Sequence, residues 1–346
     1  MKKGSIIWKS PSNIALVKYW GKTEPQIPKN PSISFTLDNC HTTTELFYEL
    51  KENPSHEYDF KIYLDQTERP DFVPKIKQFF ERIENYVPFI KQLKMEIRTK
   101  NSFPHSSGIA SSASGMSALA LCLMSLERIL DPNMTENHFI NKSSFLSRLG
   151  SGSAARSIEG PLVVWGNHPE IKGSSDLYGS KYPYETHAVF KTYHDTVLLV
   201  DKGVKQVSST IGHQLMNGHP FAEARFEQAN KHLSQLIPIL KEGNLPAFIE
   251  IVEREALSLH AMMMTSDPYF MLMKPNTLEI IDRIWSFRKQ SGTGICFTLD
   301  AGANVHVLYP DKDQKEVKAF IISDLIQFCE KNQYICDKAG AGAVRM

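Results

Sequence analysis

The spacing of apolar residues along the chain predicts a mixture of strands and helices. Residues 5–8 and 14–20 form apolar runs typical of short strands, and the threonine-rich stretch 34–47 alternates as a β-hairpin does. Apolar residues recur at helical spacing between 74 and 93, and a strand is expected over 94–99. The first hundred residues are therefore expected to begin with strands and to include one helix.

Two runs of small residues interrupt this pattern. The first, NSFPHSSGIASSASGMS over 101–117, opens directly into the apolar helical segment ALALCLMSLERIL. The second, GSGSAARSIEG over 150–160, leads into the apolar strand PLVVWG. The first run therefore predicts a loop that feeds a helix N-terminus, and the second predicts a loop before a strand.

A second α+β unit is predicted after a polar stretch over 173–185, whose Gly, Ser, Tyr and Pro content is typical of an inter-domain connection. We expect an N-terminal domain over 1–187 and a C-terminal domain over 188–346. In the latter, AVFKTYHDTVLLVD predicts a strand, and two or three long helices fill 220–291. ICFTLDAG and ANVHVLYP predict strands on either side of a glycine turn, followed by one more helix.

Composition and charge narrow the class of protein. The 346 residues are 42% hydrophobic and 22% charged, as in a soluble globular protein of two domains. A formal net charge of +1 provides no overall field for nucleic acid or an anionic membrane, so an anionic substrate would need a local cationic site. The five cysteines are scattered, and neither a secretory signal nor a membrane-length apolar run is evident, so a cytosolic location is expected.

The run PHSSGIASSA has two explanations. A glycine-containing loop at a helix N-terminus presents free N–H groups and the positive end of the helix dipole, which suit phosphate oxygens. A Ser- and Ala-rich helix start that allows close packing explains the same residues equally well. Neither a Walker lysine nor GxGxxG spacing is present.

Two further segments carry candidate anion ligands. Within SGSAAR, Arg156 offers a guanidinium beside Ser151 and Ser153, although an isolated arginine is more often part of a surface ion pair. Within SNIALVKYWGK, Lys18 lies in an apolar strand, where burying its charge would be costly without an anion. A strand with one solvent-exposed face would explain Lys18 equally simply.

The remaining candidates are ambiguous when considered alone. Asp300 ends the apolar strand ICFTL and precedes Ala301 and Gly302, so it is either a rigidly held carboxylate or a turn cap. VKQVSST supplies hydroxyls and Lys205 for phosphate oxygens, or is an ordinary polar loop. The histidines have no paired metal-ligand spacing, and no metal ligand is assigned.

In this order, the segments SNIALVKYWGK, PHSSGIASSA, SGSAAR and FTLDAGAN resemble the GHMP family of small-molecule kinases and, within it, the diphosphomevalonate decarboxylases. The resemblance extends from about Ser10 to the end of the chain. Some residues differ from the family pattern, notably His105 to Ser107 in the phosphate loop and His213 after the VSST segment. The phosphate-loop differences leave nucleotide preference open.

The resemblance implies a two-domain α+β fold, with a ribosomal-protein-like N-terminal domain and a ferredoxin-like C-terminal domain. It also implies ATP- and Mg²⁺-dependent phosphorylation and decarboxylation of mevalonate 5-diphosphate to isopentenyl diphosphate, in isoprenoid biosynthesis, by a homodimer. A decarboxylase of mevalonate monophosphate or a related small-molecule kinase is the alternative. No nucleic-acid or membrane partner is expected.

The resemblance also assigns roles to residues. Asp300, Lys18 and Arg156 would be catalytic, with Arg156 also holding the substrate carboxylate. The expected substrate-binding residues are Asn13, Tyr19, Trp20, Gly21, Lys22, Lys75, Ser151, Gly152, Ser153, Ala154, Ala155, Arg156, Ser208, Ser209 and Thr210. The expected binding residues for the ATP phosphates are Ser106, Ser107, Gly108, Ile109, Ala110, Ser111 and Ser112.

Overall fold

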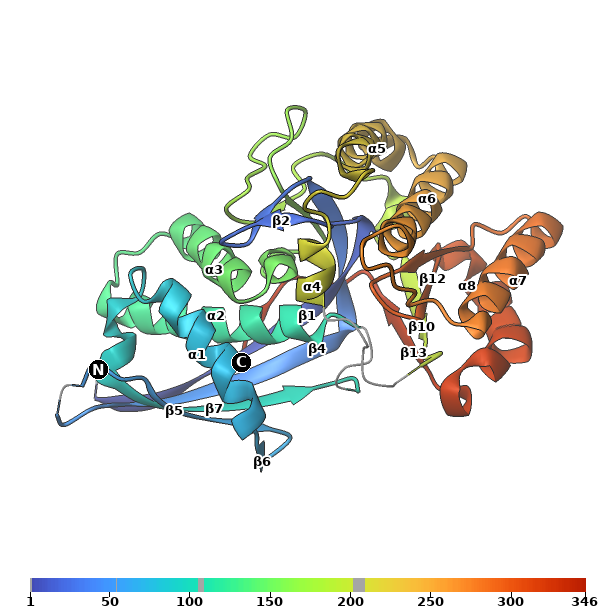
Figure 1. Cartoon of the computed structure of the whole chain (residues 1–346). Coiled ribbons are helices and arrows are strands. Elements are labelled where there is room, and N and C mark those ends of the chain that lie inside the picture. Colours follow the sequence, from blue (N-terminus) through green and yellow to red (C-terminus); the bar gives the residue numbers. More distant parts are fainter. Residues whose placement is uncertain (1, 54, 105–108, 202–208) are drawn as a thin grey trace.

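The computed structural model describes residues 2–53, 55–104, 109–201 and 209–346 and arranges them as two main sheets covered by helices, with a small two-stranded hairpin (Figure 1). The helices are α1 (Val73–Ile83), α2 (Ser111–Leu130), α3 (Glu136–Gly150), α4 (Ser209–Gln214), α5 (Ala222–Glu242), α6 (Leu245–Met264), α7 (Pro275–Ser291) and α8 (Gln314–Phe320). Of α4, the side chains of its first two residues are not described.

The larger sheet, counted over the described residues, has eight strands in the order β14-β1-β4-β7-β5-β6, with β8 pairing with β4 and β9 with β8. These strands are β1 (Lys3–Val17), β4 (Ser32–Leu50), β5 (Asp59–Leu64), β6 (Thr67–Glu68), β7 (Leu93–Asn101), β8 (Leu162–Trp165), β9 (Ser180–Lys181) and β14 (Val344–Arg345). Because β14 pairs with β1, the end of the chain returns to the sheet formed by its beginning. The division at residue 187 stays a prediction.

The expected hairpin over 34–47 is wrong, because these residues belong to the single long strand β4. The chain makes an irregularity there rather than a turn: the pairing with β1 shifts register between Pro11 and Asn13. The carboxylate of Asp337 accepts the main-chain N–H groups of Asp38, Asn39 and Cys40 at 2.6–2.9 Å. The side chain of a distant residue thus satisfies the backbone donors that the irregularity leaves without ladder partners.

The two short strands expected over 5–8 and 14–20 are likewise one strand, β1, which ends at Val17. Its polar middle is accommodated because Ser10 donates a hydrogen bond to the Ser157 carbonyl at 2.7 Å and Ser12 donates one to the Ile109 carbonyl at 2.7 Å. Buried hydroxyls with such partners cost little, so the strand continues through them. Lys18 therefore follows the strand rather than lying inside it.

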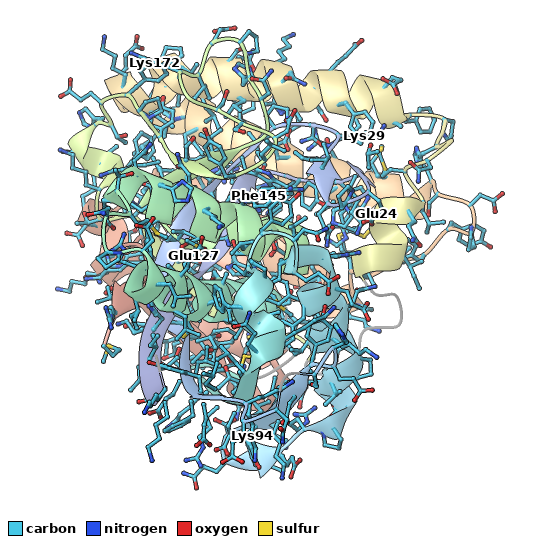
Figure 2. The ribbon with its side chains drawn as sticks, turned by 90° about the vertical axis from the view of Figure 1, so that its left-hand side faces the viewer. Glu24, Lys29, Lys94, Glu127, Phe145 and Lys172 are labelled. Atoms are coloured by element: carbon cyan, nitrogen blue, oxygen red, sulfur yellow. The ribbon has the colours of Figure 1, made fainter. Side chains whose placement is uncertain are left out.

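Helices α1, α2 and α3 lie on one side of the larger sheet (Figure 1), and α2 packs directly on β1 and β4. Figure 2 shows this layer from the side, with Glu127 of α2 and Phe145 of α3 labelled. By length and composition α2 could cross a membrane, but 72% of its most apolar window is buried inside the protein. Its apolar character is explained by this central position.

The helix expected over 74–93 ends earlier, at Ile83, and Pro88 begins a separate 3-10 turn.

The smaller sheet, again counted over the described residues, has the order β11-β12-β10-β13. Its strands are β10 (His194–Leu198), β11 (Cys296–Leu299), β12 (Val305–Tyr309) and β13 (Tyr334–Lys338), and a separate hairpin joins β2 (Lys22–Thr23) to β3 (Ile27–Pro28). The long helices expected over 220–291 are confirmed as α5, α6 and α7. Helix α6 contacts both β11 and β1, so it bridges the two sheets.

Candidate active site

A cavity of about 610 Å³ lies where the two halves of the chain meet. Its lining includes the segment after β1, the N-terminus of α2, the turn η3 (Gly152–Ser157) and the residues after β11, together with residues of α1, β4, β5 and β7. The predicted site residues on its wall are Lys18, Tyr19, Trp20, Lys22, Lys75, Ala110, Ser111, Ser112, Ser151, Gly152, Ser153, Arg156 and Asp300. Folding therefore brings together motifs that lie far apart in the sequence.

An ion pair between Lys18 and Asp300 crosses this cavity. Lys18 Nζ lies 3.2 Å from Asp300 Oδ1, and Lys18 is 1% exposed whereas the Asp300 side chain is 29% exposed. Burial lowers the pKa of the Lys18 ammonium, and the adjacent Asp300 carboxylate opposes that change. The two strand ends that carry the pair, after β1 and after β11, thus place a cation and an accessible carboxylate side by side.

Arg156 lies in η3 and is 3% exposed. Its Nη1 donates to the Ser32 hydroxyl at 2.5 Å and its Nε donates to Asn13 Oδ1 at 3.4 Å. Among the described residues, no carboxylate lies within ion-pair distance of this guanidinium. Burial consequently lowers the pKa of Arg156 to about 10, with the Asp300 charge acting in the opposite direction. A buried cation held only by neutral groups is suited to an anionic ligand.

Asn13 does not line the cavity but orients Arg156. Its amide Nδ2 donates to the Ser157 hydroxyl at 2.8 Å and to the Ser153 carbonyl at 3.1 Å, which directs Oδ1 toward the guanidinium. Asn13, which was predicted to bind substrate, therefore holds η3 and the side chain of Arg156 in place.

Two lysines add positive charge at the edges of the cavity. Lys22 Nζ donates to Gln26 Oε1 at 2.8 Å and lies 2.9 Å from Glu24 Oε1. Lys75 extends from α1 and keeps contact with solvent, while the surrounding protein lowers the pKa of its ammonium by desolvation. Figure 2 labels Glu24 near the hairpin that carries Lys22.

The small-residue run over 101–117 leads into α2 as predicted, but the helix begins at Ser111, inside the run rather than after it. Ala110 precedes the helix in a left-handed conformation (φ 40°), and no side chain caps the first turn. The N–H groups of such a turn have no intrahelical acceptors, and the helix dipole adds partial positive charge. Ser112 Oγ lies 3.2 Å from Ser151 Oγ, which joins this turn to the start of η3. Ser106, Ser107 and Gly108 lie outside the described residues.

A cluster of three aromatic rings lines another wall of the cavity. The His213 ring lies between Tyr19 and Trp20, with centroid distances of 4.2 and 4.6 Å, and its Nδ1 accepts the Gly21 N–H at 2.9 Å. Burial lowers the pKa of His213 to about 3, so the ring is neutral at ordinary pH. The Tyr19 hydroxyl is buried without a hydrogen-bond partner among the described residues, and burial raises its pKa above the usual range. Gly21 and Trp20 therefore have structural contacts in addition to any contact with substrate.

Several predicted binding residues lie away from the cavity. Ala154 and Ala155 are fully buried within η3, and the Ala155 carbonyl accepts a hydrogen bond from the Ser144 hydroxyl. Ile109 is 2% exposed, and its carbonyl accepts the Ser12 hydroxyl. Ser208 lies outside the described residues, and Ser209 and Thr210 lie in α4 with side chains that are not described.

The wall of the cavity also includes residues that the sequence motifs did not indicate. They are hydroxyl, amide and apolar side chains of β4, β5, β7, α1, the residue before α1, and α2, namely Thr42, Thr44, Ile62, Leu64, Phe72, Ile76, Ile97, Thr99, Asn101, Met116 and Leu119. These residues have no distinctive sequence pattern, because they are alternate positions of ordinary strands and helices. Their grouping arises from sheet pairing and from the packing of helices on the sheet. The described residues include no group of three or more His, Cys, Asp or Glu side chains that could hold a metal ion.

Comparisons with known proteins bear on both halves of this structure. The diphosphomevalonate decarboxylase-like N-terminal domain matches residues 10–176, and the mevalonate 5-diphosphate decarboxylase C-terminal domain matches residues 196–343. A diphosphomevalonate decarboxylase from Ganoderma lucidum is 28% identical over 336 residues, covering 90% of this chain and 80% of that protein.

Solved structures agree over almost the whole chain. The mevalonate diphosphate decarboxylase from Enterococcus faecalis is 27% identical with a TM-score of 0.82, covering 99% of this chain and 98% of that chain. A further solved structure, in complex with MVAPP, AMPPCP and magnesium, is 28% identical with a TM-score of 0.83 and the same coverage. With both domain families matched in order and this fold shared throughout, the chain belongs to the diphosphomevalonate decarboxylase family.

Proposed function

We propose that Lys18, Arg156 and Asp300 carry the reaction of this family, the ATP-dependent decarboxylation of mevalonate 5-diphosphate to isopentenyl diphosphate. The observation that supports this most directly is the arrangement around one cavity: an ion pair of 3.2 Å between Lys18 and Asp300, beside a buried arginine without a carboxylate partner among the described residues. The substrate itself carries a carboxylate, a tertiary hydroxyl and a diphosphate, which are groups that these side chains can bind.

Asp300 would orient the tertiary hydroxyl and accept its proton as the oxygen attacks the γ-phosphoryl group. Phosphoryl transfer depends mainly on alignment and on stabilisation of charge, so a carboxylate of modest basicity suffices. Lys18, at 3.2 Å, keeps that carboxylate in place and offsets negative charge near the reacting oxygen. Phosphate then leaves from the tertiary carbon.

Arg156 would bind the substrate carboxylate. A guanidinium matches a carboxylate in a two-bond geometry, and the hydrogen bonds from Arg156 to Asn13 and Ser32 hold its plane. Once phosphate has left, the carbon–carboxylate bond breaks and its electron pair forms the new double bond as carbon dioxide departs. Lys22, Tyr19, Ser151 and Ser153 would position the diphosphate end.

ATP would occupy the remaining space of the cavity, with its phosphates at the N-terminus of α2 and its base beside the wall that α1, α2 and the larger sheet form. Mg²⁺ commonly binds substrate phosphates and few protein groups. Among the described residues, the hydroxyls of Ser112 and Ser151 lie together near the helix N-terminus. The ion neutralises the charge of the ATP phosphates when bound.

Incubation of the purified protein with ATP, Mg²⁺ and each mevalonate phosphate tests this proposal, with carbon dioxide and ADP both measured. We expect equal amounts of the two products with the diphosphate. Transfer of phosphate without release of carbon dioxide would contradict the proposed decarboxylation. A preference for mevalonate monophosphate would contradict the assignment of the diphosphate as substrate. We also propose a cytosolic homodimer, which sedimentation at several concentrations would test.

A further inference from the structure

Helix α6 contacts the backbone of both members of the Lys18–Asp300 pair. Glu255 Oε2 accepts the main-chain N–H of Lys18 at 2.8 Å. Further along the same helix, His260 Nε2 donates to the main-chain carbonyl of Asp300 at 3.1 Å. Both side chains are buried, at 0% and 1% exposed, and neither lines the cavity. One helix therefore holds the two strand ends from which the pair extends.

The Glu255 carboxylate is itself held by cationic and polar groups from α5. Arg225 forms an ion pair with it through both oxygens, and His232 Nδ1 lies 2.5 Å from Oε1. Arg225 also donates to the Lys18 carbonyl at 3.2 Å, and Asn30 Nδ2 donates to the same oxygen at 2.9 Å. The N–H and the carbonyl of Lys18 are thus both bound by buried side chains.

We propose that Glu255 and His260 are positioning residues, which hold the backbones of Lys18 and Asp300 so that the ammonium and the carboxylate face each other at the substrate hydroxyl. This inference rests on the proposed roles of Lys18 and Asp300. Displacements of about 1 Å at a reacting group can cost about a hundredfold in rate, so groups that fix its backbone affect kcat without touching substrate.

The charges around the pair agree with this role. Burial alone would raise the pKa of Glu255, but Arg225, His232 and the Lys18 N–H outweigh it, so the carboxylate stays ionised. Burial lowers the pKa of His260 to about 4, so its ring is neutral and its Nε2 carries the proton given to the Asp300 carbonyl. Charge interactions link the pKa of Lys18 with those of five other titratable groups, namely Asp300, Glu255, Arg156, His260 and His306.

Substitution of His260 gives the first test. His260→Leu removes the donor to Asp300, and we expect kcat to fall about tenfold to a hundredfold while KM for mevalonate diphosphate changes less than about twofold. His260→Gln keeps an N–H donor and should recover most of the lost kcat. A wild-type kcat in His260→Leu, or a His260→Gln protein as impaired as His260→Leu, would overturn the role of His260.

The role of Glu255 is tested by a pH profile. Glu255→Gln keeps an oxygen acceptor for the Lys18 N–H but removes a negative charge that favours the Lys18 ammonium. We therefore expect the alkaline limb of the kcat profile to move to lower pH. An unchanged alkaline limb in a folded Glu255→Gln protein would contradict the proposal.

Glu253→Gln is the matched control, because Glu253 is also buried on α6 but bonds to Arg288 and Trp285 rather than to the catalytic pair. It should lose stability without a shift in the pH profile. Thermal unfolding of every variant shows whether it is folded, and the His260 pair decides the question if Glu255→Gln does not fold. Failure of the wild-type protein to decarboxylate would count against the proposed function instead.

Discussion

Asp300→Asn is the most informative single substitution, because it keeps the shape of the side chain and removes its charge and its basicity. In the structure this carboxylate lies 3.2 Å from Lys18 Nζ. With an effective dielectric constant of about 20, two unit charges at that distance attract by about 5 kcal/mol. This is an upper figure for Asp300, because its side chain is 29% exposed and water weakens the interaction.

The effect on rate follows from the proposed chemistry. Loss of a positioned general base costs about a hundredfold to ten-thousandfold, or about 3–5 kcal/mol of transition-state stabilisation. The free energy of unfolding should fall by less than the attraction between the two charges suggests. Burial already lowers the pKa of Lys18, so the lysine can lose its proton rather than remain as a buried charge without its partner.

The assay measures ADP and carbon dioxide together, and nucleotide binding is measured separately by calorimetry. We expect turnover of Asp300→Asn to fall by at least about a hundredfold while ATP affinity changes little. Asp311→Asn serves as the control, since the Asp311 side chain is 65% exposed and pairs with His194 outside the cavity. An Asp300→Asn protein with more than about a third of wild-type turnover would refute the assigned role.

Three further predictions concern other parts of the site. Arg156→Lys loses the two-bond geometry, so KM for mevalonate diphosphate should rise by about tenfold to a hundredfold in steady-state assays, and an unchanged KM would exclude carboxylate binding by Arg156. The value of kcat should be maximal below the pKa of Lys18 and should fall as pH rises through that pKa. Because burial lowers the pKa of Lys18, the fall should begin at a lower pH than for an exposed lysine, and a kcat profile extended to high pH would show it. Gly21→Ala places a Cβ 3.0 Å from the Phe226 ring at φ +90°, so it should destabilise the fold by about 1–2 kcal/mol in denaturant unfolding, and an unchanged midpoint would contradict the strain.

The sequence alone indicated candidate anion-binding segments, because their chemistry is local, but it left each of them with a second explanation. A loop of small residues before a helix exposes N–H groups wherever it lies, and Arg156 and Lys18 carry unusual charge for apolar surroundings. The long helices of the second half were also predictable from apolar spacing. Local pattern could not distinguish Asp300 as a catalytic carboxylate from Asp300 as a turn cap, and its resemblance to a family motif was needed.

Tertiary structure decided the features that depend on residues far apart in the chain. The alternation over 34–47 fits a hairpin or one long strand equally well, and the strand is continuous because Asp337, near the other end of the chain, binds the N–H groups of residues 38–40. Only the fold brings Lys18 to Asp300, and only the fold reveals Glu255 and His260 behind them, since buried helix residues have no sequence signature of their own. Local physics specifies what each segment can bind, whereas the contacts between distant segments determine which groups meet.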